Sequence, residues 1–144
     1  MEIYKNPGTR FVADFVGTSN FFSGPISDGE LSDRETGERF VVSGAVGGPT
    51  AGRGGNASIS IRPEKVVLLK SSGELPAGGE RQNLKEGAVE VVTFLGVIVR
   101  ILARMGTKLV IVDITEQYFE QNYFKMGDSI QLYFPPEDFL LFNE

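Results

Sequence analysis

The sequence predicts a mainly β fold, in which a short N-terminal helix precedes a small barrel of about six strands. Two observations support this prediction. Gly and Pro account for 18 and 7 of the 144 residues, and they lie mostly between the apolar runs. The apolar runs are short, as in folds built from many strands joined by turns. With 41% hydrophobic and 10% aromatic residues, the chain has enough apolar side chains to build a core.

The predicted helix lies near the start of the chain. Asn6 is a helix-capping residue, and Pro7 follows at the first helical position, where its missing N–H is harmless. Phe11 and Phe15 lie four residues apart and begin an apolar stripe, and Gly17 ends the helix. We expect this helix either to pack on the domain that follows or to be the last helix of a preceding domain.

Beyond the helix, the apolar pattern becomes that of strands. Met105-Gly106-Thr107 predicts a tight turn between two of them, which form a hairpin. Gly96, in the middle of the longest run, predicts a bulge or a sharp bend. Short strands with bends and long connections match an OB-like barrel better than a sandwich. The predicted strands are Asn20–Ile26, Arg39–Val42, Ala57–Ile61, Ala88–Met105, Lys108–Ile114 and Ser129–Phe134.

Composition excludes most side-chain catalysis. The chain has no Cys and no His, so it has no thiolate nucleophile, no imidazole base and no Cys- or His-based metal site. The 19 acidic residues against 14 basic ones, a net charge of −5, argue against binding to nucleic acid or to an anionic membrane surface. The sequence shows neither a membrane-spanning stretch nor a signal peptide, so we expect a soluble cytoplasmic protein.

Three local patterns favour structural roles over chemistry. The glycine-rich segment Gly44–Gly55 is predicted to be a surface loop, because the chain has no Gly-Lys pair for a phosphate-binding loop. Arg100 and Arg104, on one face of a strand, could bind an anion, but exposed arginines on a barrel exterior are the commoner case. Arg62-Pro63-Glu64 is a strand end with a candidate exposed ion pair, worth about 0–1 kcal/mol.

Several segments together resemble a known family in their order and spacing. They are residues 2–20, Ile61–Val66, Gly87–Gly96, Gly127–Leu132 and, at the tail, Asp138–Phe142. The resemblance is to the C-terminal TOBE (transport-associated OB) domain of importer-type ABC transporter ATP-binding subunits, in the branch that carries polyamines, iron and related small solutes. It covers nearly the whole chain.

The resemblance implies a domain organisation and a function. Residues 1–19 would be the linker and helix that end a nucleotide-binding domain, and residues 20–144 the TOBE regulatory domain. The chain would be the regulatory and dimerisation domain of a subunit that couples ATP hydrolysis to solute uptake. The catalytic cassette is absent from this chain, which is therefore expected not to be an enzyme and to hold no cofactor; ATP and Mg²⁺ belong to the missing nucleotide-binding domain.

The resemblance also implies partners and contacts. The expected partners are a second copy of the subunit, its own nucleotide-binding domain and, through the missing cassette, the membrane subunits on the inner face of the plasma membrane. Nucleic acid is not expected. Subunit contacts are expected at the corner of Arg62 and Glu64 and at the C-terminal segment with Phe139 and Phe142.

Two alternatives remain open. The first is a stand-alone OB module that binds a small oxyanion, with backbone N–H groups of the glycine-rich loops as donors. The second is a nucleic-acid-binding OB protein, which has aromatic residues for stacking but no basic groove to follow a phosphate backbone. Core packing and loop anchoring are the commoner roles of such aromatics, which are Phe21, Phe22, Phe94, Tyr118, Phe119, Tyr123 and Phe124.

Overall fold

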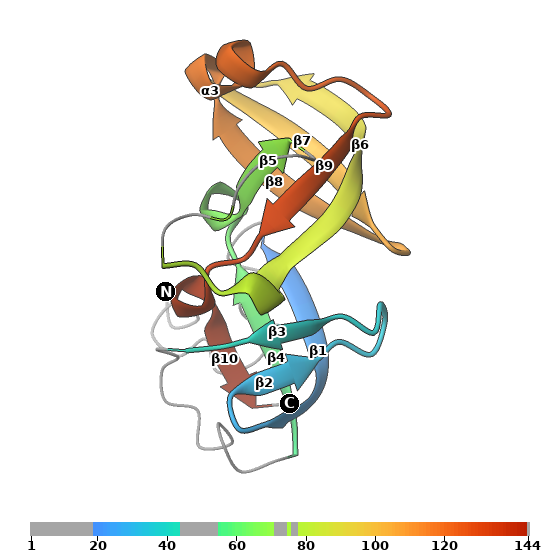
Figure 1. Cartoon of the computed structure of the whole chain (residues 1–144), viewed down its shortest axis with the longest axis vertical. Coiled ribbons are helices and arrows are strands. Elements are labelled where there is room, and N and C mark those ends of the chain that lie inside the picture. Colours follow the sequence, from blue (N-terminus) through green and yellow to red (C-terminus); the bar gives the residue numbers. More distant parts are fainter. Residues whose placement is uncertain (1–18, 44–54, 71–74, 76–77, 144) are drawn as a thin grey trace, which may run out of the picture. The chain divides into compact units, whose positions relative to one another are not determined.

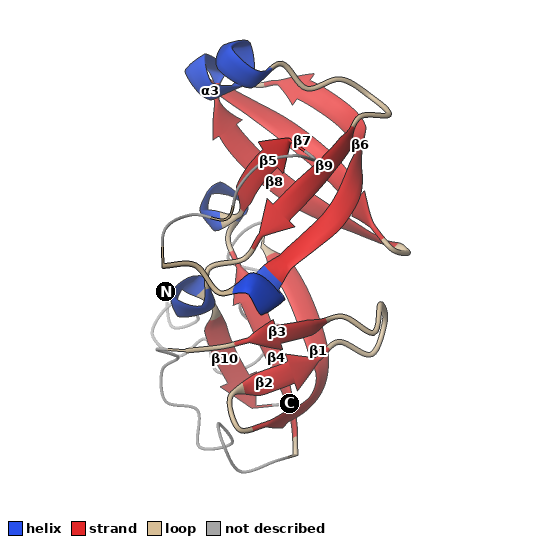
Figure 2. Cartoon of the chain, in the orientation of Figure 1, coloured by secondary structure: helices blue, strands red, loops and turns tan. Residues whose placement is uncertain are grey.

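A computed structural model of the chain describes residues 19–43, 55–70, 75 and 78–143. These residues form two compact units, which are described separately. The first unit holds the described residues up to Arg62 together with those from Pro136 onward, and the second holds those from Pro63 to Pro135. Strands dominate both units (Figures 1 and 2).

The first unit is an antiparallel five-stranded sheet in the order β10-β4-β1-β2-β3. Asp28 and Gly29, both with positive φ, make the two-residue turn between β1 and β2, where an Asp-Gly pair is strongly preferred. The elements are β1 (Asn20–Ser27), β2 (Glu30–Ser32), β3 (Arg39–Val41), β4 (Asn56–Ile61), the 3-10 helix η3 (Pro136–Asp138) and β10 (Leu140–Asn143).

Aromatic rings fill the core of this first unit. The Phe22 and Phe40 ring centroids lie 4.5 Å apart, and the Phe139 ring meets Phe40 edge-on at 5.7 Å. The buried carboxylate of Asp33 holds the turn after β2, since it accepts hydrogen bonds from the Ser23 N–H, 3.2 Å away, and from the Thr36 hydroxyl, 2.7 Å away. The remaining buried apolar residues of the unit are Phe21, Ile26, Leu31, Val42, Ala57, Ile59, Ile61 and Phe142.

The second unit is an antiparallel five-stranded sheet in the order β5-β9-β6-β7-β8. The sheet is curled, so that its two end strands, β5 and β8, come into contact (Figure 1). The 3-10 helix η1, which precedes β5, also packs against β8. Its elements are η1 (Pro63–Lys65), β5 (Val67–Lys70), η2 (Arg81–Asn83), β6 (Leu84–Phe94), β7 (Ile98–Met105), β8 (Lys108–Thr115), α3 (Glu116–Asn122) and β9 (Ser129–Tyr133).

The prediction of a mainly β fold is confirmed, but its barrel of about six strands is corrected to ten described strands in two sheets. The predicted run Ala88–Met105 is two strands, β6 and β7, because Gly96 adopts φ +89° in a tight turn rather than a bend within one strand. The hairpin of β7 and β8 around Gly106 is confirmed. The predicted helix at residues 6–17 lies outside the described residues, as does most of Gly44–Gly55.

The α-helix that the structure does describe, α3, follows β8 and was not predicted. Thr115 caps its first turn, because its hydroxyl oxygen accepts a hydrogen bond of 3.0 Å from the Tyr118 N–H. The helix ends at Tyr123, whose φ of +52° is unusual for a residue with a side chain. No helix within the described ranges is long and apolar enough to cross a membrane.

Candidate functional site

The four residues expected to make subunit contacts occupy two kinds of environment. Arg62 and Glu64 are exposed and flank the buried Pro63, which begins η1 directly after β4. Proline ends the strand here because it has no N–H to donate to the ladder. Both charged side chains are therefore accessible to a partner.

Phe139 and Phe142, in contrast, are core residues of the first unit. They are only 1% and 4% exposed, and the Phe139 ring packs on Phe40. Leu140, between them, is 49% exposed and belongs to β10, which pairs with β4 and stands at the end of the sheet order. A partner at this segment would meet Leu140 and the edge of β10 rather than the two rings.

The two arginines of β7 are each paired with a carboxylate. Arg100 makes two hydrogen bonds to Asp113, opposite it on β8, at 2.8 and 2.9 Å, and these bonds raise its pKa. Arg104 makes two bonds to Glu90, at 3.1 and 3.3 Å. Glu90 lies at the bulge between Val89 and Val91, and a bulge can redirect a side chain. The structural role is therefore favoured over an anion site.

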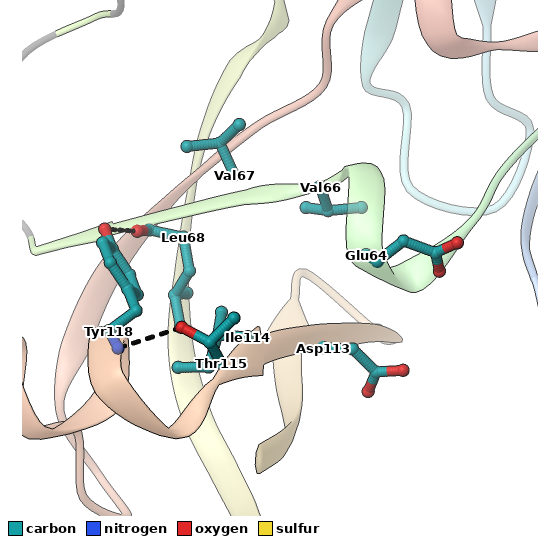
Figure 3. A pocket seen from close by; sticks show the side chains of 8 residues that line it. All are labelled: Glu64, Val66, Val67, Leu68, Asp113, Ile114, Thr115 and Tyr118. Atoms are coloured by element: carbon teal, nitrogen blue, oxygen red, sulfur yellow. Dashed lines mark hydrogen bonds between the residues drawn. The ribbon is translucent and has the colours of Figure 1, made fainter. Parts of the chain in front are cut away.

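The second unit contains a cavity of about 300 Å³ between η1 and β5 on one side and β8 and α3 on the other (Figure 3). The hydroxyl of Tyr118 reaches across from α3 and donates a hydrogen bond to the carbonyl oxygen of Leu68 in β5. Val66, Val67, Leu68 and Ile114 provide the apolar walls.

Three ionisable groups line this cavity, on Glu64, Asp113 and Tyr118. The Asp113 carboxylate is occupied by Arg100, and burial raises the pKa of Tyr118 above its ordinary value. A general acid or base works best with a pKa near the operating pH, so this shift moves Tyr118 away from such a role. Among the described residues no group of three or more Asp, Glu, His or Cys side chains could hold a metal ion. The apolar walls of the cavity suit packing or the binding of an apolar group.

Lys70, at the end of β5, anchors the loop that follows α3. Its ammonium group donates a hydrogen bond of 2.5 Å to the carbonyl oxygen of Tyr123 and lies 4.6 Å from the centre of the Phe124 ring. It also lies 3.8 Å from the carboxylate of Asp128. Three contacts from one side chain therefore hold the segment between α3 and β9 in place.

Asp128 closes the same loop from the other side. Its carboxylate accepts a hydrogen bond of 3.0 Å from the Lys125 N–H, which is the local role expected of the Gly127-Asp128 turn. This backbone hydrogen bond is the main reason that the pKa of Asp128 is lowered, and the charges of Lys125 and Lys70 add to the effect. Gly127 adopts φ +91°, which glycine tolerates best.

Comparison with protein families matches residues 59–142 to the TOBE domain. Among curated proteins, the chain is 29% identical, over 98% of its length and 36% of the relative's, to the Fe(3+) ions import ATP-binding protein FbpC 2 of Rhizobium meliloti (strain 1021). It is 41% identical, over 56% of its length and 23% of the relative's, to the spermidine/putrescine import ATP-binding protein PotA 1 of Pseudomonas aeruginosa (strain PAO1). The chain thus spans about a third or less of these relatives.

Among solved structures, the chain is similar to the cytoplasmic molybdate-binding protein ModG in its molybdate-bound form. The TM-score is 0.68, the sequence identity is 16%, and the match covers 87% of this chain and 96% of that one. At this identity the likeness concerns the fold alone. It agrees with an OB-like β architecture.

Proposed function

Because the chain belongs to the TOBE domain family, we propose that it is the C-terminal regulatory and dimerisation domain of an ABC importer ATPase subunit. The observation that carries this proposal is the family match over residues 59–142. The names of the relatives support it, since they are import ATP-binding proteins. The whole subunit would couple ATP hydrolysis to the uptake of a small solute.

The proposal assigns ATP and Mg²⁺ to a nucleotide-binding domain outside this chain and gives the chain itself no catalytic step. The ion pairs Arg100–Asp113 and Arg104–Glu90 join neighbouring strands, and the hydrogen bond of Tyr118 joins α3 to β5. Residues 20–144 would form the regulatory domain, and residues 1–19 the connection to the nucleotide-binding domain.

The proposed partners are a second copy of the subunit, its own nucleotide-binding domain and the membrane subunits of the transporter. The complex would lie in the cytoplasm, on the inner face of the plasma membrane. Arg62 and Glu64 are accessible for subunit contacts. Because Phe139 and Phe142 are buried, contact at the C-terminal segment would run through Leu140 and the edge of β10.

A stand-alone oxyanion-binding module is the alternative. The likeness to the molybdate-binding protein ModG concerns the fold and does not favour this function. Calorimetric titration of the chain with molybdate, sulfate and phosphate separates the two proposals. Saturable heat from one of these anions would support the module, whereas a regulatory domain without an anion site gives none.

The decisive experiment is the mass of the native protein in its source cell, measured by immunoblot with an antibody raised against this chain. We expect a band more than twice the 15.7 kDa of the chain, because the chain covers about a third or less of its relatives. The longer protein should hydrolyse ATP, and the 144-residue chain alone should not. A band at the mass of the chain would reject the regulatory-domain proposal.

A further inference from the structure

The second unit exposes a cluster of large apolar side chains, which we term the α3 surface. Its members are Phe94, Leu95, Val97, Tyr123 and Met126, each 51% to 76% exposed. They come from the end of β6, the β6–β7 turn and the loop after α3. The Glu116 N–H donates a hydrogen bond of 3.0 Å to the Val97 carbonyl, so the β6–β7 turn lies at the start of α3.

Ring contacts join the two parts of the α3 surface. Phe119 of α3 meets Phe94 edge-on, with 5.3 Å between ring centroids, and lies 5.6 Å from the Tyr123 ring. A groove of about 510 Å³ opens between Phe94, Tyr123 and Met126. Lys125 is the charged residue that lines it. Exposed side chains of this kind are common singly, but a contiguous group around a groove marks an interaction site.

The conformation of Tyr123 argues that this exposure is built into the fold. The residue adopts φ +52°, a region that L residues with bulky side chains avoid at a cost of about 1–2 kcal/mol. Lys70 stabilises this conformation, since its ammonium group binds the Tyr123 carbonyl at 2.5 Å. The fold thus holds an aromatic ring in water in a strained conformation, and strain of this kind accompanies binding sites.

The charges at the two ends of the α3 surface indicate what covers it. Glu116 begins α3, next to Val97, and Lys125 follows the end of the helix. The seven residues of α3 span about 10 Å at 1.5 Å per residue. Glu116 and the exposed Glu120 make the α3 end of the surface acidic. Lys125 lies at the other end, where its ammonium group is 3.6 Å from the Asp128 carboxylate, and the exposed Tyr123 ring lies between these charges. A two-fold axis through the middle would bring Glu116 of one copy to Lys125 of the other.

We propose that the α3 surface is where a second copy of this chain docks, with the Phe94, Tyr123 and Met126 side chains of the two copies buried against each other. The inference rests on the proposed function, because it names the surface that would serve dimerisation. Apolar contact would supply most of the affinity, and the two Glu116–Lys125 pairs would fix the relative orientation. The surface shares no residue with the expected contacts at Arg62, Glu64, Phe139 and Phe142.

Sedimentation equilibrium of the 144-residue chain, over a wide concentration range, tests the proposal. We expect a reversible dimer whose Kd rises about tenfold or more in the double variant Val97→Ser/Met126→Ser, as for buried contact residues. Leu109→Ser is the matched control, because Leu109 is also exposed but lies at the β7–β8 hairpin, at the other end of β8 from α3. This control should leave the Kd unchanged.

A charge exchange tests the two-fold arrangement itself. Glu116→Lys and Lys125→Glu should each weaken the dimer, and the double variant should restore it, because each charge meets the opposite charge of the other copy. Mixing the two single variants should also restore association, because in the heterodimer one contact joins the two exchanged charges and the other joins the native Lys125 and Glu116, and both contacts then pair opposite charges. Thermal unfolding of every variant shows whether the chain remains folded.

The outcomes separate this inference from the proposed function. A dimer that the double variant and the charge variants leave unchanged would overturn the α3 surface as the interface while dimerisation itself stands. A chain that remains monomeric at all concentrations would also overturn it, and the immunoblot would still decide whether the chain belongs to a longer importer subunit. A loss of affinity with charge rescue would establish the interface.

Discussion

The phenol hydroxyl of Tyr118 donates a hydrogen bond to the backbone carbonyl of Leu68, 50 positions away in the sequence. Tyr118 belongs to α3 and Leu68 to β5, an end strand of the sheet. The bond satisfies a carbonyl of a residue that is only 1% exposed. The bond therefore ties α3, the one α-helix in the described part of the chain, to β5, an end strand that pairs with β9.

Tyr118→Phe should destabilise the chain by about 1–2 kcal/mol, because it leaves the buried Leu68 carbonyl without its donor. The free energy of unfolding in urea measures the loss. Burial raises the pKa of Tyr118 in the folded chain above its value in the unfolded chain. The stability that the neutral Tyr118 side chain contributes is therefore complete below the unfolded-state pKa and is lost as the pH rises through the folded-state pKa. Wild type and variant should therefore converge in strongly alkaline solution, and a constant difference would contradict this account.

Asn83→Ala should cost about 1–3 kcal/mol of stability. The Asn83 side chain is fully buried, and its Nδ2 donates a hydrogen bond of 2.7 Å to the Phe134 carbonyl. Truncation removes this buried hydrogen bond. Gln82→Ala is the control, because Gln82 is exposed, and it should stay within about 0.5 kcal/mol of wild type. Equal losses in the two variants, measured by urea unfolding, would refute the prediction.

Gly24→Ala should destabilise the first unit more than Gly87→Ala destabilises the second. A Cβ at Gly24 would lie 1.8 Å from the Ser32 carbonyl oxygen, so backbone must move. At Gly87 the corresponding distance, to the Arg104 carbonyl oxygen, is 2.8 Å. We expect more than about 3 kcal/mol for Gly24→Ala and about 1–3 kcal/mol for Gly87→Ala. Calorimetric unfolding temperatures give the order, and the reverse order would be incompatible with these distances.

Asp128→Asn should reduce stability at neutral pH but not in acid. The Lys125 N–H and the nearby lysine charges lower the Asp128 pKa, so its contribution is present above the unfolded pKa. The contribution is lost as the pH falls through the lower folded pKa, below about pH 4. Unfolding midpoints of wild type and variant should differ at pH 7 and merge near pH 2. A difference that grows on acidification would show that Asp128 acts in another way.

Phe139→Ala should cost about 3–5 kcal/mol of stability, because it opens a cavity beside Phe40 in the core of the first unit. Leu140→Ala, at a half-exposed neighbour, should cost much less. The comparison matters for contact mapping, since a loss of self-association in Phe139→Ala could follow from unfolding alone. Circular dichroism during thermal unfolding separates the two effects.

Parts of the fold could be predicted because their signals are local. The alternation of apolar residues located most of β1, β3, β4, β8 and β9, and Met105-Gly106-Thr107 located the β7–β8 turn. Of the four described strands with three or four residues, β3 was located, whereas β2, β5 and β10 were missed, because so few residues give only a weak alternation. For α3, Thr115 gave a capping signal, but the helix has only seven residues.

The candidate site could be predicted less well. The sequence placed Phe94 and Tyr123 among aromatics expected to be core or loop anchors, and exposure sets them apart only in the folded chain. One signal was available: Leu95 and Val97 flank the turn glycine Gly96, a position where polar residues are usual. Phe139 and Phe142 were expected at a subunit contact from the family resemblance, and only the folded chain shows that they are core residues of the first unit.

The sequence by itself determined the mainly β composition, the turn between β7 and β8 and the family, because these depend on residue types and on their order and spacing along the chain. The tertiary structure decided which strands share a sheet, that Arg104 meets Glu90 at a bulge, and that Tyr123 faces water while Phe139 does not. The physical reason is that burial and pairing depend on segments far apart in the chain. Each side chain's environment is set by neighbours that a local pattern does not contain.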